Sequence, residues 1–310
     1  MMNVRTRRPS HGRLLTTGLL MASMALVMAC GATGSSGSSP AQTTWQRILA
    51  THIVRVGFTN EAPYSVAQPD KTTGIDPDIM RAFLTSQGVT EIDGVLMDFG
   101  SLIPALEANR IDVITAGLWI NTDRCKQIAF SDPTTQVGQG FAVKKGNPMN
   151  LHSYADVAKA GARFGANTGG LEFGWADIAG IPKANQVQFP DLQTSIAALQ
   201  AGRVDAVSNN TFAIADYLNT LKDPNLEYVP LTTQPVDENG KSTEAYSSFG
   251  FRQADTDFVT AFNAWVSTQK ASGDLLKLIS PYGITADAIP PASVTAASLC
   301  GAPAPSPSGS

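Results

Sequence analysis

Two segments of the chain share one pattern of apolar and polar positions: LIPALEANRIDVIT (102–115) and SIAALQAGRVDAVS (195–208). In each, apolar residues at helical spacing precede a short run that is apolar enough for a buried parallel strand. Asn109 and Gly202 lie between the two parts, where a helix C-terminus favours a left-handed residue. Each segment therefore predicts a helix, a turn and a strand.

A second repeated pattern lies upstream of each copy. RVGFTN (55–60) and RFGANT (163–168) both read as a strand followed by a loop. Because both repeats occur in the same order, the sequence predicts an α/β protein with two lobes of similar plan.

Two extended runs mark where the chain crosses between these lobes: GQGFAVKKGNP (138–148) and AYSSFGFRQAD (245–255). Residues 258–279 then have helical periodicity, which indicates a return to the first lobe. We therefore assign 45–141 and 246–300 to lobe 1 and 142–245 to lobe 2, joined by a two-strand hinge. Since ligands of open α/β sheets bind beyond the carboxyl ends of the strands, we expect the site in the cleft between the lobes.

The N-terminal segment has the anatomy of a secretory signal peptide, with four arginines and then an apolar stretch over 1–29. VMAC (27–30) resembles a bacterial lipobox, which implies cleavage before Cys30 and a lipid on its sulfur; an ordinary signal peptide is the alternative. Residues 31–44 are rich in Gly and Ser and predict a flexible tether, and 301–310 predict a disordered tail. The folded part is thus expected outside the cytoplasm, anchored to the membrane surface.

Composition narrows the function classes further. The formal net charge is −4, and it becomes more negative once the four arginines before Cys30 are removed, which argues against a nucleic-acid partner. The chain has three histidines and no CxxC, HExxH or glycine-rich phosphate loop ending in Lys. We therefore expect no metal site and no cofactor.

Several stretches resemble the extracytoplasmic solute-binding proteins of ABC importers, in the amino-acid-binding group. Within that group they are similar to the ectoine/hydroxyectoine-binding proteins. The stretches are GFTNEAPYS (57–65), FGSLIPALEANRIDVITAGLWI (99–120), TDRCKQIAFSDPT (122–134), VKKGNPMNLHSYADV (143–157) and LQAGRVDAV (199–207). The resemblance implies a type II periplasmic-binding-protein fold, a small zwitterionic ligand, delivery to a transmembrane permease, and a monomer.

The resemblance places a carboxylate-binding arginine at Arg124, in a short helix that we expect Thr122 to cap. The alternative is a surface arginine that pairs with Asp123 or Asp132. From lobe 2, the loop containing Gly170 and Leu171 is expected to offer free backbone amides at a helix N-terminus. The alternative there is a flexible Gly-Gly turn.

The positive end of the ligand is expected among aromatic side chains. The resemblance aligns Tyr64, Phe99 and Trp119 with the aromatic cage of ectoine binders, and such rings suit a weakly hydrated cation. The alternative is that these three rings lie in the protein core. Glu61 is expected to accept N–H bonds from the cation, unless it is a solvated loop acid. The list of expected site residues is completed by Gly117 in the same strand-end loops and by Asn210, where many amino-acid binders carry Asp.

Once Cys30 carries lipid, Cys125 and Cys300 remain, and an oxidising compartment favours a disulfide between them. Two free thiols are the alternative.

The function that these observations favour is a lipid-anchored solute-binding protein for ectoine or hydroxyectoine, without enzymatic activity. A polar or cationic amino acid, and then a betaine, are the alternative ligands. A dehydratase-like enzyme with Glu61 as proton donor, or a sensory lobe pair, are the alternative classes.

Overall fold

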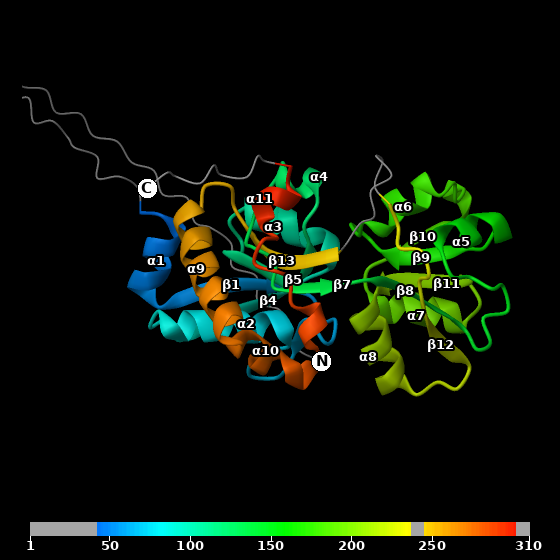
Figure 1. The fold of residues 1–310 in the computed structure, drawn as a ribbon, viewed down its shortest axis with the longest axis horizontal. Helices are drawn as coiled ribbons and strands as arrows, with labels where there is room; N and C mark the ends of the chain where they lie inside the picture. The colour runs from blue at the N-terminus through cyan, green and yellow to red at the C-terminus, as the bar shows by residue number, and fades with distance from the viewer. Residues whose placement is uncertain (1–41, 237–244, 302–310) are drawn as a thin grey trace, which may run out of the picture. The chain divides into compact units, whose positions relative to one another are not determined.

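Two mixed β-sheets form the framework of the computed structural model, which describes residues 42–236 and 245–301 (Figure 1). The expected signal peptide, Cys30, most of the tether and the C-terminal tail lie outside the described residues. None of the helices within 42–236 and 245–301 has the length and hydrophobicity that a membrane span requires.

The first sheet has the strand order β4-β1-β5-β13-β6, with β7 also paired to β13. Strands β1, β4 and β5 are parallel, and β13 runs antiparallel to its neighbours. The strands are β1 (Ile53–Phe58), β4 (Glu91–Leu96), β5 (Val113–Trp119), β6 (Ala129–Phe130), β7 (Thr135–Val137) and β13 (Ala245–Phe251).

The second sheet has the order β10-β9-β11-β8-β12, in which β9, β10 and β11 are parallel and β8 runs antiparallel to both of its neighbours, β11 and β12. A separate small ribbon pairs β2 (Val66–Ala67) with β3 (Thr72–Thr73). The strands of the second sheet are β8 (Gln139–Lys144), β9 (Phe164–Asn167), β10 (Gln186–Phe189), β11 (Ala206–Asn210) and β12 (Leu226–Pro230).

Helices cover both faces of each sheet (Figure 1). Those packed on the first sheet are α1 (Thr44–Thr51), α2 (Ile75–Ser86), α3 (Leu102–Glu107), α4 (Thr122–Cys125), α9 (Thr256–Ser272), α10 (Asp274–Ile279) and α11 (Ala296–Leu299). Those on the second are α5 (Tyr154–Ala160), α6 (Glu172–Ile178), α7 (Leu192–Gln200) and α8 (Thr211–Leu221). The expected α/β fold with two lobes is confirmed, and we call the sheets with their helices lobe 1 and lobe 2.

One arginine–aspartate pair occurs in both lobes with the same geometry. In lobe 1, Arg55 donates from its backbone N–H and Nε to Asp112 Oδ2, at 3.0 and 3.1 Å, and from Nη2 to Oδ1 at 2.7 Å. In lobe 2, Arg163 makes the same three bonds to Asp205, at 2.8, 3.0 and 2.7 Å. The Arg that opens each upstream repeat thus binds the Asp that directly precedes β5 or β11, which confirms the predicted duplication.

The turns before β5 and β11 also have the predicted conformation. Asn109 has φ 56° and Gly202 has φ 68°, both in the left-handed region. The backbone N–H of the following residue, Arg110 or Arg203, closes the helix end on a carbonyl five residues back.

The chain passes from the first sheet to the second at Gly138, between β7 and β8. It returns between β12 and β13, through a segment that includes residues outside the described range. After the return, α9 and α10 pack on the first sheet, as their periodicity predicts. The exact division of the chain into domains stays a prediction.

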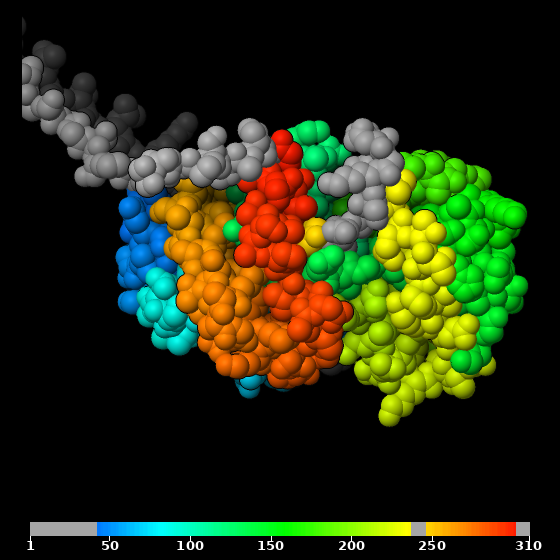
Figure 2. Space-filling view, in the orientation of Figure 1, coloured from blue at the N-terminus to red at the C-terminus, as the bar shows by residue number. Residues whose placement is uncertain are grey.

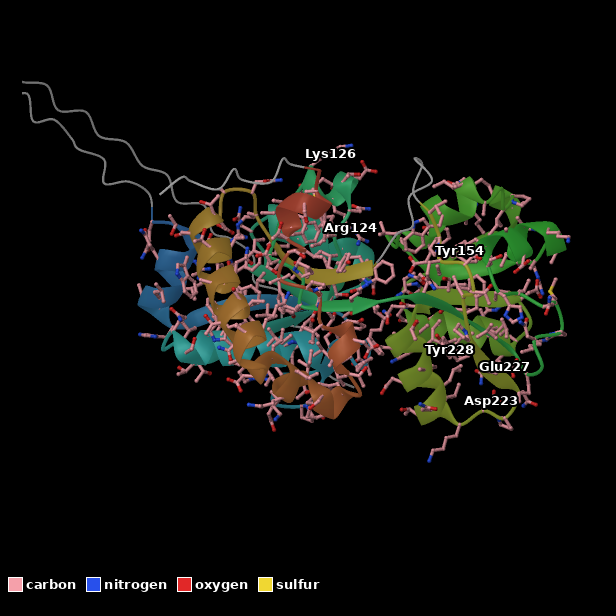
Figure 3. The ribbon with its side chains drawn as sticks, viewed as in Figure 1. Arg124, Lys126, Tyr154, Asp223, Glu227 and Tyr228 are labelled. Atoms are coloured by element: carbon pink, nitrogen blue, oxygen red, sulfur yellow. A yellow bond between two sulfur atoms is a disulfide. The ribbon has the colours of Figure 1, made fainter. Side chains whose placement is uncertain are left out.

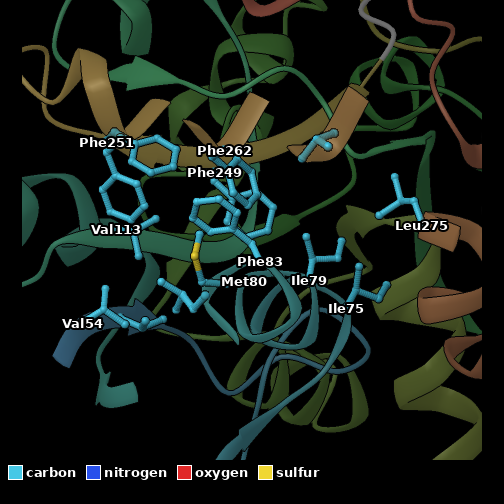
Figure 4. Close-up of a cluster of buried hydrophobic side chains, with 14 of the residues drawn as sticks. Val54, Ile75, Ile79, Met80, Phe83, Val113, Phe249, Phe251, Phe262 and Leu275 are labelled. Atoms are coloured by element: carbon cyan, nitrogen blue, oxygen red, sulfur yellow. The ribbon is translucent and has the colours of Figure 1, made fainter. Parts of the chain in front are cut away.

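The largest hydrophobic cluster lies between the first sheet, α2 and the two returning helices (Figure 4). Phe83 of α2 meets Phe262 of α9 edge to face at 5.1 Å, and Phe249 of β13 meets Phe262 at 4.7 Å. These rings are fully buried, and large aromatic side chains contribute most to burial energy. Residues from the two ends of the described chain therefore stabilise one core.

The C-terminal segment lies over the surface of lobe 1, where Figure 2 shows it in red beside the orange helices. Cys125 and Cys300 form a disulfide with a Cα–Cα distance of 5.7 Å. Asp132 also holds the C-terminal segment on lobe 1, because its Oδ1 accepts the N–H of Ala296 at 2.9 Å.

Candidate functional site

A cavity lies where residues of both lobes meet, and its wall combines charged, amide-bearing and apolar residues. Lobe 1 contributes Glu61, Phe99, Ala116, Gly117, Trp119 and Arg124; lobe 2 contributes Gln139, Asn167, Gly170, Leu171, Glu172, Asn209 and Asn210. Several of these residues end parallel strands, as Trp119 ends β5, Asn167 ends β9 and Asn210 ends β11. The cavity is therefore at the carboxyl ends of the strands, where the sequence predicts it.

Arg124 lies in α4 and is 7% exposed (Figure 3). The prediction that Thr122 caps this helix is wrong: Asn121 is the N-cap, and its side chain accepts the N–H of Arg124 at 2.7 Å. Both are good capping residues, but Thr122 already has helical conformation, so the preceding residue takes the role. The alternative that Arg124 is a surface residue paired with Asp123 or Asp132 does not hold, because Arg124 is buried and lines the cavity.

The guanidinium of Arg124 is held by carbonyl groups from both lobes. Its Nη1 donates to Trp119 O at 2.9 Å, and its Nη2 donates to Gly169 O at 3.0 Å. Its Cζ lies 5.4 Å from the centre of the Phe99 ring, within cation–π range. Burial lowers the pKa of Arg124 to about 10, and the Glu172 charge opposes that shift. The group therefore remains a cation at neutral pH, with its orientation fixed.

The loop before α6 brings backbone and a carboxylate to the same wall. The N–H of Gly170 donates to Asn167 O at 3.0 Å, so the expectation of a free backbone amide is wrong for Gly170: the turn before α6 uses this amide internally. A Cβ at Gly170 would lie 2.1 Å from Glu172 Oε2, so a side chain at this position would displace that carboxylate. Gln139 Nε2 donates to the other oxygen, Glu172 Oε1, at 3.1 Å. Burial raises the pKa of Glu172, so this part of the wall holds an acid that favours its neutral form more than an exposed glutamate does.

Glu61 is the second acid of the wall, and this half-buried residue connects the lobes. Its loop is closed by two backbone bonds with Ser65, at 2.8 and 2.9 Å. Its Oε2 accepts from Asn167 Nδ2 at 3.0 Å and from Asn209 Nδ2 at 3.1 Å, both from lobe 2. Burial raises the pKa of Glu61 to about 7, against the lowering effect of these two hydrogen bonds. The alternative of a solvated loop acid is therefore wrong.

Two of the three expected cage aromatics line the cavity. Phe99 begins the short turn of 3-10 helix Phe99–Ser101, and Trp119 packs at 5.6 Å against Trp175 of lobe 2. Tyr64 is only 1% exposed and belongs to the core of lobe 1, so it does not line the cavity. Its ring fills the space beside Gly117, where a Cβ would come within 2.7 Å of it. Tyr64 therefore lies in the protein core, which was the alternative to a place in the aromatic cage.

Gly117 has a φ of +60°, a conformation that side chains rarely adopt. Its backbone N–H donates to Asp76 Oδ2 at 2.6 Å, and Asp76 is buried at the start of α2. Burial raises the pKa of Asp76 to about 7, against the lowering effect of this bond. Asp76 and Tyr64 thus fix the backbone of the wall without reaching the cavity.

Eight of the nine residues expected in the site line the cavity: Glu61, Phe99, Gly117, Trp119, Arg124, Gly170, Leu171 and Asn210. Sequence reasoning did not assign a role to Gln139, Asn167, Glu172 or Asn209. Asn167 and Asn209 could have been found from their place at the strand ends. Gln139 and Glu172 gave no such signal, because they come from the crossing strand and from the first residue of a helix. Among the described residues, no cluster of three or more potential metal ligands occurs.

Comparison with known proteins gives a family match over most of the chain. The family model of the bacterial extracellular solute-binding proteins, family 3, matches residues 54–285. The chain is 30% identical over 249 residues to a probable amino-acid ABC transporter periplasmic-binding protein, y4tE, of Sinorhizobium fredii, covering 79% of this chain and 82% of that protein. It is 26% identical to a probable histidine-binding protein of Neisseria gonorrhoeae, covering 85% and 92% respectively.

Solved structures give a similar result. The crystal structure of EhuB in complex with hydroxyectoine matches with a TM-score of 0.76 and 33% identity, over 83% of this chain and 97% of that one. An ancestral amino-acid-binding protein, AncCDT-1, described as a precursor of cyclohexadienyl dehydratase, matches with a TM-score of 0.67 and 25% identity, over 77% and 99%.

Proposed function

Since the chain belongs to the bacterial extracellular solute-binding proteins of family 3, we propose that its cavity binds a small zwitterion, ectoine or hydroxyectoine, for an ABC importer. The observation that carries this proposal is the separation of charges on the wall. Arg124 is buried and Glu61 half-buried, and among the described residues they form no ion pair with each other. A ligand with both charges can meet a guanidinium and a carboxylate at once.

Phe99 and Trp119 favour a delocalised cation in this proposal. Their faces attract a weakly hydrated charge, at roughly 0.5–2 kcal/mol for each good contact. The cyclic amidinium of ectoine is such a cation, and Glu61 would accept its N–H groups. Tyr64 would support the wall through Gly117 rather than by direct contact. The EhuB complex with hydroxyectoine, a neighbour at 33% identity, supports the same ligand class.

A polar or cationic amino acid is the second candidate ligand, and Glu172 is the observation that favours it. This acid places a second carboxylate on the wall, which would suit an additional positive group. Relatives described as arginine-binding and histidine-binding proteins support this alternative.

The two lobes support the proposed role as a carrier. A ligand that touches both lobes binds the closed arrangement better than an open one, so it shifts the population towards closure. Delivery to a permease, a lipid anchor on Cys30 and a monomeric state complete the proposal. We propose binding without catalysis, although a dehydratase precursor is among the structural neighbours.

A thermal-shift screen followed by calorimetry tests the ligand. The probes are ectoine, hydroxyectoine, L-arginine, L-histidine and glycine betaine. We expect the largest rise in Tm with ectoine or hydroxyectoine, since a ligand at 100 times its Kd stabilises the protein by about 2.7 kcal/mol. No shift with either ectoine, together with a shift from an amino acid, would replace the first ligand with the second. Chemical conversion of any bound probe, detected by mass spectrometry, would contradict binding without catalysis.

Affinity for a cationic ligand is expected to rise with pH through the region around 7. Glu61 has a pKa of about 7 without ligand, so near neutral pH it must lose its proton before its carboxylate can face a cation. Binding then releases protons, and affinity falls by up to about tenfold per pH unit below 7. Calorimetry at pH 7 in two buffers of different ionisation enthalpy measures this release. In Glu61→Gln the proton release should disappear; unchanged release would assign it to Glu172 or Asp76.

A further inference from the structure

We propose that Asn167 determines which cations the site accepts: together with Glu61 it selects a positive group that carries N–H donors and rejects a fully alkylated ammonium. This inference rests on the proposed function and specifies the ligand class of the same site.

Asn167 is a lining residue of the cavity whose side chain carries an unpaired acceptor. It is 9% exposed, and its Oδ1 is buried without a hydrogen-bond partner. Of the described residues whose buried polar atoms lack a partner, Asn167 is the one that lines the cavity. A buried acceptor without a donor costs about 1–3 kcal/mol, and a ligand N–H at this point would remove that cost.

The orientation of the Asn167 amide is set by Glu61. Nδ2 of Asn167 donates to Glu61 Oε2 at 3.0 Å, so its Oδ1 is turned away from that carboxylate. Reversing the amide would place two oxygens against each other, which the ionised acid disfavours. Two hydrogen-bonded side chains of the wall, Asn167 and Glu61, therefore each keep an acceptor, the free amide oxygen and the carboxylate.

Asn209 makes the same bond to Glu61 but has no free acceptor. Its Nδ2 donates to Glu61 Oε2 at 3.1 Å. Its Oδ1 already accepts the backbone N–H and the Nδ2 of Asn210, at 2.7 and 3.0 Å. Asn209 is thus a matched control, with the same residue type, the same partner and the same wall.

The aromatic faces cannot supply this selectivity. A ring attracts an amidinium and a trimethylammonium alike, because the attraction depends on charge and not on N–H groups. A quaternary ammonium would fill the space between Phe99 and Trp119 and leave Asn167 Oδ1 unpaired. Sites built to hydrogen-bond a donor discriminate strongly against analogues that lack it.

The test measures Kd by calorimetry for two probes, ectoine with its N–H groups and glycine betaine with none. We expect the wild-type protein to prefer ectoine. Asn167→Leu should weaken ectoine binding about tenfold to a hundredfold and leave glycine betaine unchanged or tighter, so that the ratio of the two affinities collapses. If leucine at position 167 disturbs folding, Asn167→Ala serves as the second variant. It should reduce the ratio of the two affinities in the same way. Asn209→Leu removes the same bond to Glu61 and is expected to weaken the binding of both probes, so the ratio of the two affinities should change by less than about threefold.

The outcomes separate this inference from the proposed function. If wild-type protein binds ectoine and Asn167→Leu leaves the ratio unchanged, the inference is overturned and the proposed function stands. If wild-type protein binds L-arginine instead, the same comparison is made with its Nα-trimethyl derivative; an unchanged ratio again overturns the inference. If none of the probes binds, both are overturned.

Discussion

Replacing Arg124 with alanine is expected to weaken ligand binding at least about a hundredfold. The guanidinium is buried and fixed by Trp119 O and Gly169 O, so it meets a carboxylate without reorganisation. Each hydrogen bond between charged groups contributes about 1.5–3 kcal/mol, and two parallel bonds account for the expected loss. Arg124→Lys should bind with intermediate affinity, because an ammonium is a point charge that cannot form the paired bonds.

Lys126→Ala is the control for this experiment. Lys126 lies two residues away on the exposed side, where its Nζ pairs with Asp123 at 2.7 Å. Calorimetry with ectoine should find its Kd within about twofold of the wild-type value, as surface ion pairs contribute little. If Arg124→Ala also stays within threefold of the wild type, the assignment of the anion end is wrong.

Replacing Asp112 with alanine is expected to lower the free energy of unfolding by about 3–5 kcal/mol. The Asp112 side chain is fully buried and pairs with the guanidinium groups of Arg55 and Arg47, with Arg252 nearby at 3.5 Å. Without the carboxylate, these cations lose the acid that compensates them.

The duplicated pair of lobe 2 is the matched control. Asp205 makes the same bonds to Arg163, but its side chain is 25% exposed and that of Arg163 is 44% exposed. Asp205→Ala should therefore cost about 1 kcal/mol or less. Denaturant unfolding with the disulfide intact measures both variants. If both variants lose the same free energy of unfolding, burial does not explain the contribution of the Asp112 cluster to stability.

The same cluster makes a defined contribution to the pH dependence of stability. Burial alone would raise the pKa of Asp112, but hydrogen bonds from Arg55 and Arg47 lower it below its ordinary value. This contribution is therefore present above the ordinary pKa of an aspartate, near 4. It is lost as the pH falls through the lower folded-state value.

The repeats were sufficient to predict the architecture because they encode local structure directly. The pairs 102–115 with 195–208, and 55–60 with 163–168, carry apolar periodicity and turn residues that depend on short-range rules. The pairs Arg55–Asp112 and Arg163–Asp205 have the same geometry in the two lobes. This geometry was not predicted, since pairing across strands depends on the register of the folded sheet.

The candidate site was predictable where it follows from the ends of strands, and it was missed where packing decides. Tyr64 and Phe99 both lie in loops after strands, yet one fills the core beside Gly117 and the other lines the cavity. The choice depends on Gly117, because the absence of a side chain there leaves space for the Tyr64 ring. Glu172 was overlooked because its role depends on a carboxylate folding back over Gly170, a tertiary contact that spacing does not reveal.

A crystal structure of the protein with ectoine tests the central claim most directly: one zwitterion bridges two lobes, with its carboxylate on a guanidinium and its cation among aromatic faces and acceptors. We expect the ligand carboxylate within hydrogen-bond distance of the Arg124 Nη atoms, and the amidinium ring against Phe99 and Trp119 with its N–H groups on Glu61 and Asn167. Ligand density outside this cavity, or a carboxylate that does not reach Arg124, would contradict the account.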